Sequence, residues 1–380
     1  MQKEPLAEEN DADFSYNINQ FLEMMVENKA SDLIVKVGSP PAFRIDGTIL
    51  KADMEALKQH QVEKLARDFL TSEEVGRVIS GHEFDGSHAV SGLGRFRVNA
   101  FMQRETMAMV FRYIEDDILN FSELHLPEAI EKITRFERGL VLITGTTSSG
   151  KSTTLASLID HINRTQRKHI ITIEDPIEFV HKDRKSIVTQ REIGLDTQDF
   201  SSALKYVLRQ DPDIILLGEM RDQETVEAAM EAAETGHLVF STLHTNSAAQ
   251  TVNRIIDFFP KKEQEQIRIL LAEHLQAVAG QRLLARKDTD GMIPAVELMF
   301  NIPIIKKLIE DDRVSKLRSA IHQGENEGMQ TFDQALVELY NNGFINEDQA
   351  KRYCSKPSNF EKYVSGHYPD VDMGVLGGLR

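Results

Sequence analysis

The chain has 380 residues, of which 41% are hydrophobic and 27% charged, a composition typical of a soluble globular protein with two domains. Its formal net charge of -16 argues against a nucleic-acid partner, because such proteins present basic stripes to the phosphate backbone. The single cysteine, Cys354, rules out an internal disulfide and a cysteine-built zinc site, and we expect it to be a partly buried small residue in a reducing cytoplasm. No apolar run approaches the ~18 residues of a membrane span, and the N-terminus does not resemble a signal peptide.

Residues 1–115 are predicted to form a small α+β domain. Apolar residues follow a helical period from Ile18 to Val26, and strand-like segments with turns then alternate with short helical ones. A strand-rich block, residues 84–114, carries four arginines among apolar residues: Arg95, Arg97, Arg104 and Arg112. Residues 116–126 are predicted to be a linker, and Pro127 to begin a helix.

A phosphate-binding motif follows in residues 145–152. The apolar run Leu140–Ile143 is predicted to be a buried strand, and apolar residues at helical spacing come after Gly-x-x-x-x-Gly-Lys-Ser. Gly145 and Gly150 allow the backbone to turn tightly and to bring its N–H groups against phosphate oxygens at a helix N-terminus. The flanking strand and helix disfavour the alternative, a chance match in a Gly/Ser-rich loop.

Within this loop, Lys151 supplies positive charge for the β- and γ-phosphates, and the Ser152 hydroxyl can ligate Mg²⁺. We therefore predict a site for ATP and Mg²⁺. Its predicted phosphate-binding residues are Gly145, Thr146, Thr147, Ser148, Ser149, Gly150, Lys151, Ser152 and Thr153.

Three further apolar strands are predicted at residues 169–174, 214–217 and 238–244, alternating with helical segments. This alternation is typical of an open parallel sheet, whose ligand site lies at the C-terminal ends of the strands. From residue 261 onward the pattern is mostly helical, with a hairpin-like piece near residues 281–299.

Hydrolysis of a γ-phosphate needs Mg²⁺, a positioned water and a group that neutralises developing charge. Glu174 and Glu219 follow two of the predicted strands, so one can orient or deprotonate the water while the other holds Mg²⁺ through its hydration shell. The division of labour stays open, because the second strand ends in Gly-Glu where such strands usually end in Asp. His244 can contact the γ-phosphate. The alternatives are solvated or helix-capping carboxylates and a merely packed histidine.

Arg97 and Arg112 are predicted to act in trans. A P-loop site without its own arginine finger commonly receives one from a neighbouring subunit. The alternative is a solvated sheet face, and Arg95 and Arg104 are weaker candidates for the same role.

Taken together, the motifs resemble those of the type IV pilus retraction motors, PilT and PilU, of the secretion-ATPase superfamily. The resemblance runs from about Phe21 to Tyr353. Its parts are an Asp box at Thr172–Phe179, a Walker B motif at Asp211–Asp222, a His box at Gly236–Asn246, and arginine-bearing strands at Gly94–Asn99 and Val110–Arg112. Residues 304–310 lack the Ala-Ile-Arg motif of PilT-type motors, which together with residues 328–336 suggests a closer likeness to PilU.

The resemblance implies a PAS-like N-terminal domain (1–115) and a RecA-like ATPase domain with C-terminal helices (127–355). Residues 356–380, with their scattered glycines, are predicted to be a flexible tail. The resemblance also implies a homo-hexameric, cytoplasmic motor at the inner face of the inner membrane, with ATP between subunits, Glu174 as catalytic glutamate and Glu219 in the Walker B role. Its expected partners are a membrane-embedded platform protein and a PilT-type motor.

Other functions remain open from the sequence. One is an accessory ring component whose own ATP turnover is dispensable. A pilus-extension or type II secretion ATPase is disfavoured by the single cysteine, because those enzymes usually carry a four-cysteine metal subdomain. A DNA motor is disfavoured by the negative charge.

Overall fold

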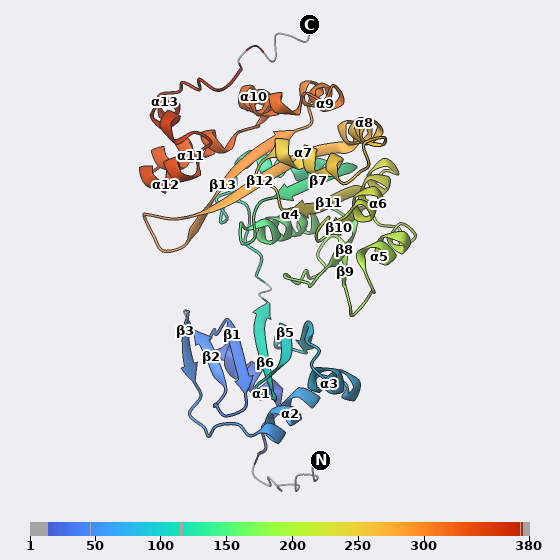
Figure 1. The fold of residues 1–380 in the computed structure, drawn as a ribbon, viewed down its shortest axis with the longest axis vertical. Coiled ribbons are helices and arrows are strands. Elements are labelled where there is room, and N and C mark those ends of the chain that lie inside the picture. The colour runs from blue at the N-terminus through green and yellow to red at the C-terminus, as the bar shows by residue number, and fades with distance from the viewer. Residues whose placement is uncertain (1–13, 46, 115–116, 373, 375–380) are drawn as a thin grey trace. The chain divides into compact units, whose positions relative to one another are not determined.

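The structure is a computed structural model that describes residues 14–45, 47–114, 117–372 and 374 (Figure 1). It divides into two compact units, Met1–Asp116 and Asp117–Arg380, each of which has its own hydrophobic core. In the part of the chain that is described, no helix is long and apolar enough to cross a membrane.

The first unit is a six-stranded antiparallel sheet with three helices. The strand order is β3-β2-β1-β6-β5-β4. The strands are β1 (Asp32–Lys36), β2 (Ala42–Ile45), β3 (Thr48–Lys51), β4 (Phe84–Val90), β5 (Gly94–Gln103) and β6 (Thr106–Ile114), and the helices are α1 (Ile18–Glu27), α2 (Gln59–Arg67) and α3 (Ser72–Ile79). This is the α+β domain that the sequence predicts.

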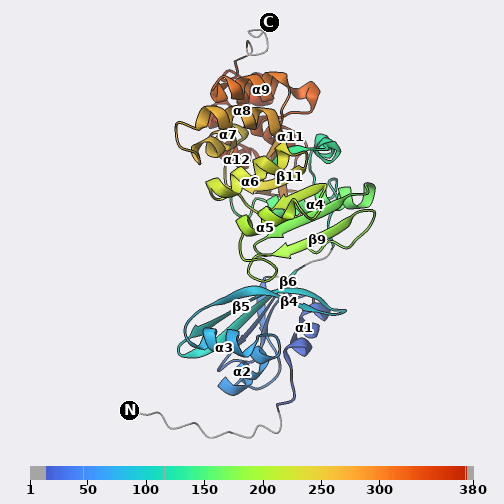
Figure 2. The same cartoon turned by 90° about the vertical axis from the view of Figure 1, so that its right-hand side faces the viewer.

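The helices cover one face of this sheet, as Figure 2 shows for α2 and α3. Alternate residues of β5 and β6, such as Phe96, Val98 and Phe111, are fully buried in the core on that face. Because successive strand residues point to opposite faces, Arg97 and Arg112 lie on the other face.

The second unit is built on a seven-stranded sheet of order β13-β12-β7-β11-β10-β8-β9. All neighbouring strands are parallel except β12 and β13, which form an antiparallel hairpin. The strands are β7 (Gly139–Thr144), β8 (His169–Glu174), β9 (Ile187–Glu192), β10 (Ile214–Leu217), β11 (Leu238–Leu243), β12 (Leu275–Ala285) and β13 (Met292–Phe300).

Helices follow most of these strands, and a helical group ends the chain. Along the sheet these are η1 (Glu128–Arg135, a 3₁₀ helix), α4 (Lys151–Thr165), α5 (Phe200–Val207), α6 (Gln223–Glu234), α7 (Ala248–Asp257) and α8 (Gln264–His274). The C-terminal group comprises α9 (Pro303–Glu310), η2 (Val314–Lys316), α10 (Leu317–Gln323), η3 (Glu325–Glu327), α11 (Phe332–Asn341), α12 (Glu347–Tyr353), η4 (Pro357–Asn359) and α13 (Phe360–Val364).

The central strands β7, β10 and β11 are buried at every position, as expected for a sheet covered on both faces. Since β7, β8, β10 and β11 run in the same direction, the segments after their last residues gather at one edge of the sheet. The sequence predicts these four strands and the β12–β13 hairpin. It does not predict β9 and α5, which the structure contains.

The segment expected to be a flexible tail is packed over residues 357–371. Phe360 and Tyr363 of α13 are each 1% exposed, and they join a small core with α11 and the β12–β13 hairpin. The prediction for this segment is therefore wrong. The glycines of the segment are typical of a flexible tail, but its two aromatic side chains bury apolar area. The expectation for residues 373 and 375–380 lies outside the described residues.

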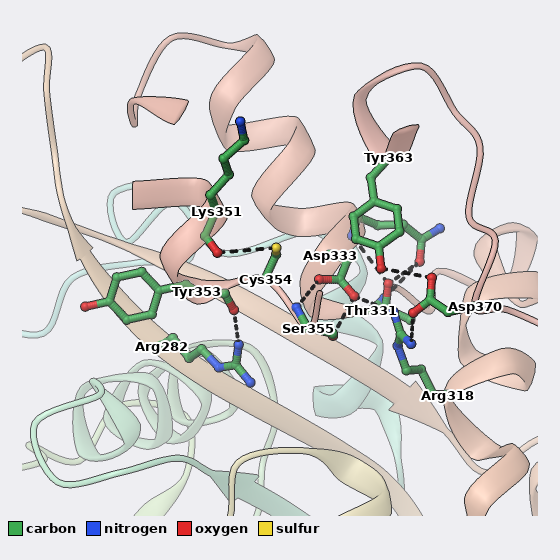
Figure 3. Close-up of polar contacts among 11 residues, drawn as sticks. Arg282, Arg318, Thr331, Asp333, Lys351, Tyr353, Cys354, Ser355, Tyr363 and Asp370 are labelled. Carbon is green, nitrogen blue, oxygen red and sulfur yellow. Dashed lines mark hydrogen bonds and ion pairs between the residues drawn. The ribbon is translucent and has the colours of Figure 1, made fainter. Parts of the chain in front are cut away.

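Polar contacts hold the same segment in place (Figure 3). Arg318 of α10 contacts both Asp333 of α11 and Asp370, and the Tyr363 hydroxyl donates to Asp370 over 2.9 Å. Ser355 donates its backbone N–H and its hydroxyl to Asp333, over 2.8 and 2.7 Å. Cys354 beside it is buried.

The predicted linker, residues 116–126, belongs in part to the second unit. Leu126 is buried in the core of that unit, and Phe121 and Leu124 pack against it. The boundary between the two units falls between residues 116 and 117.

Candidate nucleotide-binding site

The loop between β7 and α4 has the backbone of a phosphate cradle. Gly150 has φ +88° and is the N-cap of α4, so no side chain covers the helix N-terminus there. A Cβ atom at Gly145 would lie 2.6 Å from the carbonyl oxygen of Gln281 and 2.4 Å from Ser149 Oγ. Both glycines are thus required by the loop itself, and the first backbone N–H groups of α4 remain available to an anion.

Lys151 is folded onto this loop. Its Nζ donates to the carbonyl oxygens of Gly145 and Thr146, both over 3.0 Å, and the residue is only 9% exposed. Burial lowers the pKa of Lys151, whereas the nearby carboxylates of Glu219 and Glu178 act in the opposite direction. A phosphate group at the loop would give this buried ammonium a strong anionic partner, so the cradle fits a nucleotide.

A cleft of about 360 Å³ opens beside the loop. It collects side chains from the ends of β8, β10 and β11 as well as from the P-loop. The predicted site residues that line it are Thr147, Ser148, Lys151, Ser152, Glu174, Glu219 and His244. Gly145, Thr146, Ser149, Gly150 and Thr153 belong to the same loop and the start of α4 but are not among the lining residues.

Glu174, the last residue of β8, is held by two side-chain donors. Its Oε1 accepts from Thr172 Oγ1 over 2.6 Å and from Gln190 Nε2 over 3.2 Å. Burial raises the pKa of Glu174 to about 7, although both hydrogen bonds favour the charged form and so limit the rise. A carboxyl group that titrates near neutral pH suits a general base.

Glu219 lies between two basic groups. Its Oε2 accepts from Arg221 Nε over 3.0 Å, and its Oε1 lies 3.3 Å from His244 Nε2. Arg221 also lies 3.9 Å from Asp175, which follows Glu174. The ends of β8, β10 and β11 are therefore linked by polar contacts across the cleft.

Ser152 and Glu219 suit a Mg²⁺ ion that is only partly held by protein. Within the described ranges, no group of three or more His, Cys, Asp or Glu side chains is placed to hold a metal. Mg²⁺ typically keeps several waters and binds one or two protein groups plus the phosphates of its nucleotide. A hydroxyl and a carboxylate on the same cleft match that donor set.

Sequence reasoning missed three polar residues of this site. Arg221 follows Glu219 by two positions, so that spacing was available as a signal. Thr172 precedes Glu174 by two positions on the same strand, so its spacing was also a signal. Gln190 could not be recognised from the sequence, because its contact with Glu174 depends on the pairing of β9 beside β8.

The two predicted arginine fingers belong to the first unit, where they face each other across β5 and β6. Arg112 Nε donates to Asp32 Oδ1 over 2.9 Å, and Arg44 Nε lies 3.3 Å from Asp32 Oδ2. Arg97 forms an exposed ion pair with Asp85, 2.9 Å between Nη2 and Oδ2. The strand register places Arg44, Asp32, Arg112 and Arg97 in one row across the sheet.

Comparison with known proteins gives consistent results. Residues 7–292 match the family described as type II/IV secretion system protein. The chain is 45% identical over 344 residues to the type IV pilus retraction ATPase PilT of Pseudomonas aeruginosa, covering 90% of this chain and 100% of PilT. It is 39% identical over 354 residues to the type IV pilus ATPase PilU of the same organism, covering 93% of each.

The solved structures include the pilus retraction motor PilT with bound ADP. It superposes with a TM-score of 0.85 at 43% identity and covers 91% of this chain and 99% of that one. The α/β unit with the P-loop is thus a RecA-like ATPase domain. The expected closer likeness to PilU is wrong as measured by identity, which is higher to PilT.

Proposed function

The chain belongs to the type II/IV secretion system protein family, and on that premise we propose that it is an ATP-hydrolysing motor that drives or assists type IV pilus retraction. Relatives named as pilus retraction ATPases match nearly the whole chain, and the RecA-like fold is that of PilT with ADP. The observation that carries the proposal is that the P-loop lysine and both strand-end glutamates line one cleft.

The residues divide the work of hydrolysis as follows. The P-loop N–H groups and Lys151 bind and neutralise the phosphates. Glu174, with a pKa of about 7, accepts the proton of the attacking water; this pKa and its position at the cleft support Glu174 as the base. Ser152 and Glu219 would hold Mg²⁺, which neutralises phosphate charge when it is bound. His244 contacts Glu219 and lies within reach of the same cleft.

The assembly in the proposal is a homo-hexamer. Arg97 and Arg112 stand on a separate folding unit with part of their side chains exposed, 41% and 68%, so they are available to a neighbouring subunit. The proposed partners are a membrane-embedded platform protein and a PilT-type motor, at the cytoplasmic face of the inner membrane. Work on the pilus would then come from changes in ring shape.

Turnover and binding, measured separately, test the enzyme. We expect Lys151→Ala to lose nucleotide affinity and turnover, and Glu174→Gln to keep nucleotide binding while its ATPase rate falls by roughly a hundredfold or more, within the range for general-base loss. Lys307→Ala is the control, because this lysine pairs with Asp311 on the exposed side of α9. Unchanged ATPase rates in both site variants would exclude the proposed activity.

An accessory role is the second candidate, because the resemblance to PilU, a paralogue regarded as an accessory to PilT, implies it, and the chain matches PilU over 93% of its length. One experiment in cells distinguishes an accessory role from that of an independent motor. Cells that carry Lys151→Ala together with an active PilT-type motor would still retract pili, whereas cells that depend on this chain alone would not.

A further inference from the structure

Gln190 lies on β9, the edge strand that the sequence did not reveal, and it reaches the end of β8. The register pairs Thr172 with Gln190, and both side chains donate to the same oxygen of Glu174, Oε1. Two donors on adjacent strands thus hold the same oxygen of the Glu174 carboxylate. Neither of them uses the second oxygen, Oε2.

Backbone groups determine which end of the Gln190 amide faces Glu174. Its Oε1 accepts from the backbone N–H of His181 over 2.8 Å, and its Nε2 donates to the carbonyl oxygen of Phe179 over 2.9 Å. A backbone N–H can only donate and a carbonyl can only accept, so the amide cannot be flipped without losing both bonds. The remaining N–H of Nε2 is therefore directed to Glu174.

We infer that Gln190 is a positioning residue for hydrolysis: by holding Oε1 it fixes the orientation in which the Glu174 carboxylate accepts the proton of the attacking water. The inference rests on the proposed ATPase function. Gln190 does not line the cleft itself, so it acts through Glu174.

The same amide also connects Glu174 to the wall of the cleft. Phe179 and His181, whose backbone groups Gln190 binds, both line it. Burial lowers the pKa of His181 to about 4, so this side chain is neutral at physiological pH. One side chain thus sets the position of the base relative to the surrounding wall.

The test uses two substitutions of nearly equal size. Gln190→Leu removes the donor, and Gln190→Glu replaces it with a group that repels both the Glu174 carboxylate and the Phe179 carbonyl. We expect kcat for ATP to fall roughly tenfold or more in Gln190→Leu, as for loss of a hydrogen bond to a charged group, and further in Gln190→Glu. KM and the affinity for a non-hydrolysable ATP analogue should change by less than about threefold.

Thr189→Val is the matched control on the same strand. The next residue, Gln190, faces Glu174, whereas Thr189 points to the other face of the sheet, where its hydroxyl contacts His169. Its kcat should stay within about twofold of the wild type. Thr172→Val, which removes the other donor without changing the shape of the side chain, should reproduce the kcat-specific loss and serves if Gln190 variants fold poorly.

A double-mutant cycle separates positioning from general stabilisation. In a Glu174→Gln background, Gln190→Leu should cause no further loss of kcat, because there is no base left to position. Wild-type kcat in Gln190→Leu, or equal losses of kcat and analogue affinity, would overturn the inference while leaving the ATPase assignment intact. An inactive wild-type protein would instead overturn the proposed function.

Discussion

Ionisation of Glu174 is needed for activity but lowers the stability of the folded protein. As a base it must be ionised, yet burial raises its pKa from 4.5 to about 7, so the folded protein disfavours that ionised form. Thr172 and Gln190 limit this effect by donating to the carboxylate.

A dependence of the ATPase rate on pH follows. We expect kcat to rise with pH up to about 7 and then to level off, because only the deprotonated carboxylate accepts a proton. Below the pKa the rate should fall about tenfold per pH unit. Steady-state rates between pH 5.5 and 9 at saturating ATP measure this limb; a flat profile would remove Glu174 from the role of base.

The same pKa predicts that Glu174→Gln stabilises the second unit at neutral pH. The folded wild type binds more protons than the unfolded chain between pH 4.5 and about 7, so its stability falls as pH rises through that window. The neutral amide removes this dependence. The variant should match the wild type near pH 4.5 and exceed it above pH 7 by up to about 3 kcal/mol, at 1.36 kcal/mol per pKa unit. Urea unfolding at the two pH values checks it, and equal differences at both would contradict it.

At the scale of elements, the C-terminal segment is attached to the second unit by one buried ion-pair network. Asp370 is 4% exposed and contacts Arg318, which also contacts the buried Asp333 of α11. Burial alone would lower the pKa of Arg318, but its bonds to Asp370 and Asp333 raise it above its usual value. The packing of α13 therefore depends on a charged anchor as well as on Phe360 and Tyr363.

Two neighbouring aspartates allow this anchor to be tested. Asp370→Asn removes one of the two carboxylates that bind Arg318 and weakens the bond that Asp370 accepts from Tyr363, so it should lower the unfolding free energy of the second unit by roughly 2 kcal/mol, as for loss of a hydrogen bond to a charged group. Asp372→Asn is the control, because its side chain is 50% exposed where it pairs with Lys316. Denaturation midpoints of the full chain measure both. Equal shifts would mean that the buried network contributes no more to stability than the exposed ion pair.

How far the sequence predicts these elements depends on how local their signals are. β7, β10 and β11 are continuous apolar runs, and the P-loop has fixed spacing, so both could be recognised without knowing their neighbours. β9 is an edge strand in which two apolar residues, Ile187 and Val188, are followed by four polar ones, and only the last, Glu192, is buried. Its identity, and with it the role of Gln190, depends on pairing with β8, which no local pattern specifies.

The C-terminal segment escaped prediction for a related reason. Its glycines and short helices are typical of a loosely held tail, whereas in the structure Phe360 and Tyr363 pack in a core with the β12–β13 hairpin and Asp370 binds Arg318. Contacts between residues far apart in sequence thus account for both the missed strand and the missed helix.

At the scale of the whole molecule, the proposed site is shared between subunits. Arg112→Ala and Lys151→Ala, each with little ATPase activity alone, should regain a measurable fraction of the wild-type rate when the two proteins are mixed and allowed to exchange. In mixed rings, the intact second unit of one protein meets the intact first unit of the other.

The control mixture combines Lys151→Ala with Glu174→Gln. Both changes lie in the second unit, so every nucleotide site in those rings is defective and no recovery is expected. ATPase rates over a series of mixing ratios make the measurement. Equal recovery in the two mixtures, or none in the first, would contradict a trans role for Arg112.

The buried carboxylate of Asp32 has a consequence for the timing of such a cycle. It binds Nε of Arg112, near the base of the guanidinium group, although 68% of the arginine side chain is exposed. A free arginine loses about 2 kcal/mol of rotamer entropy when it is held in one conformation. Here much of that entropy is lost once, when the domain folds, and not at every turnover. The speed with which Arg112 enters a neighbouring site would then depend on the motion of its domain and not on a search among its own rotamers.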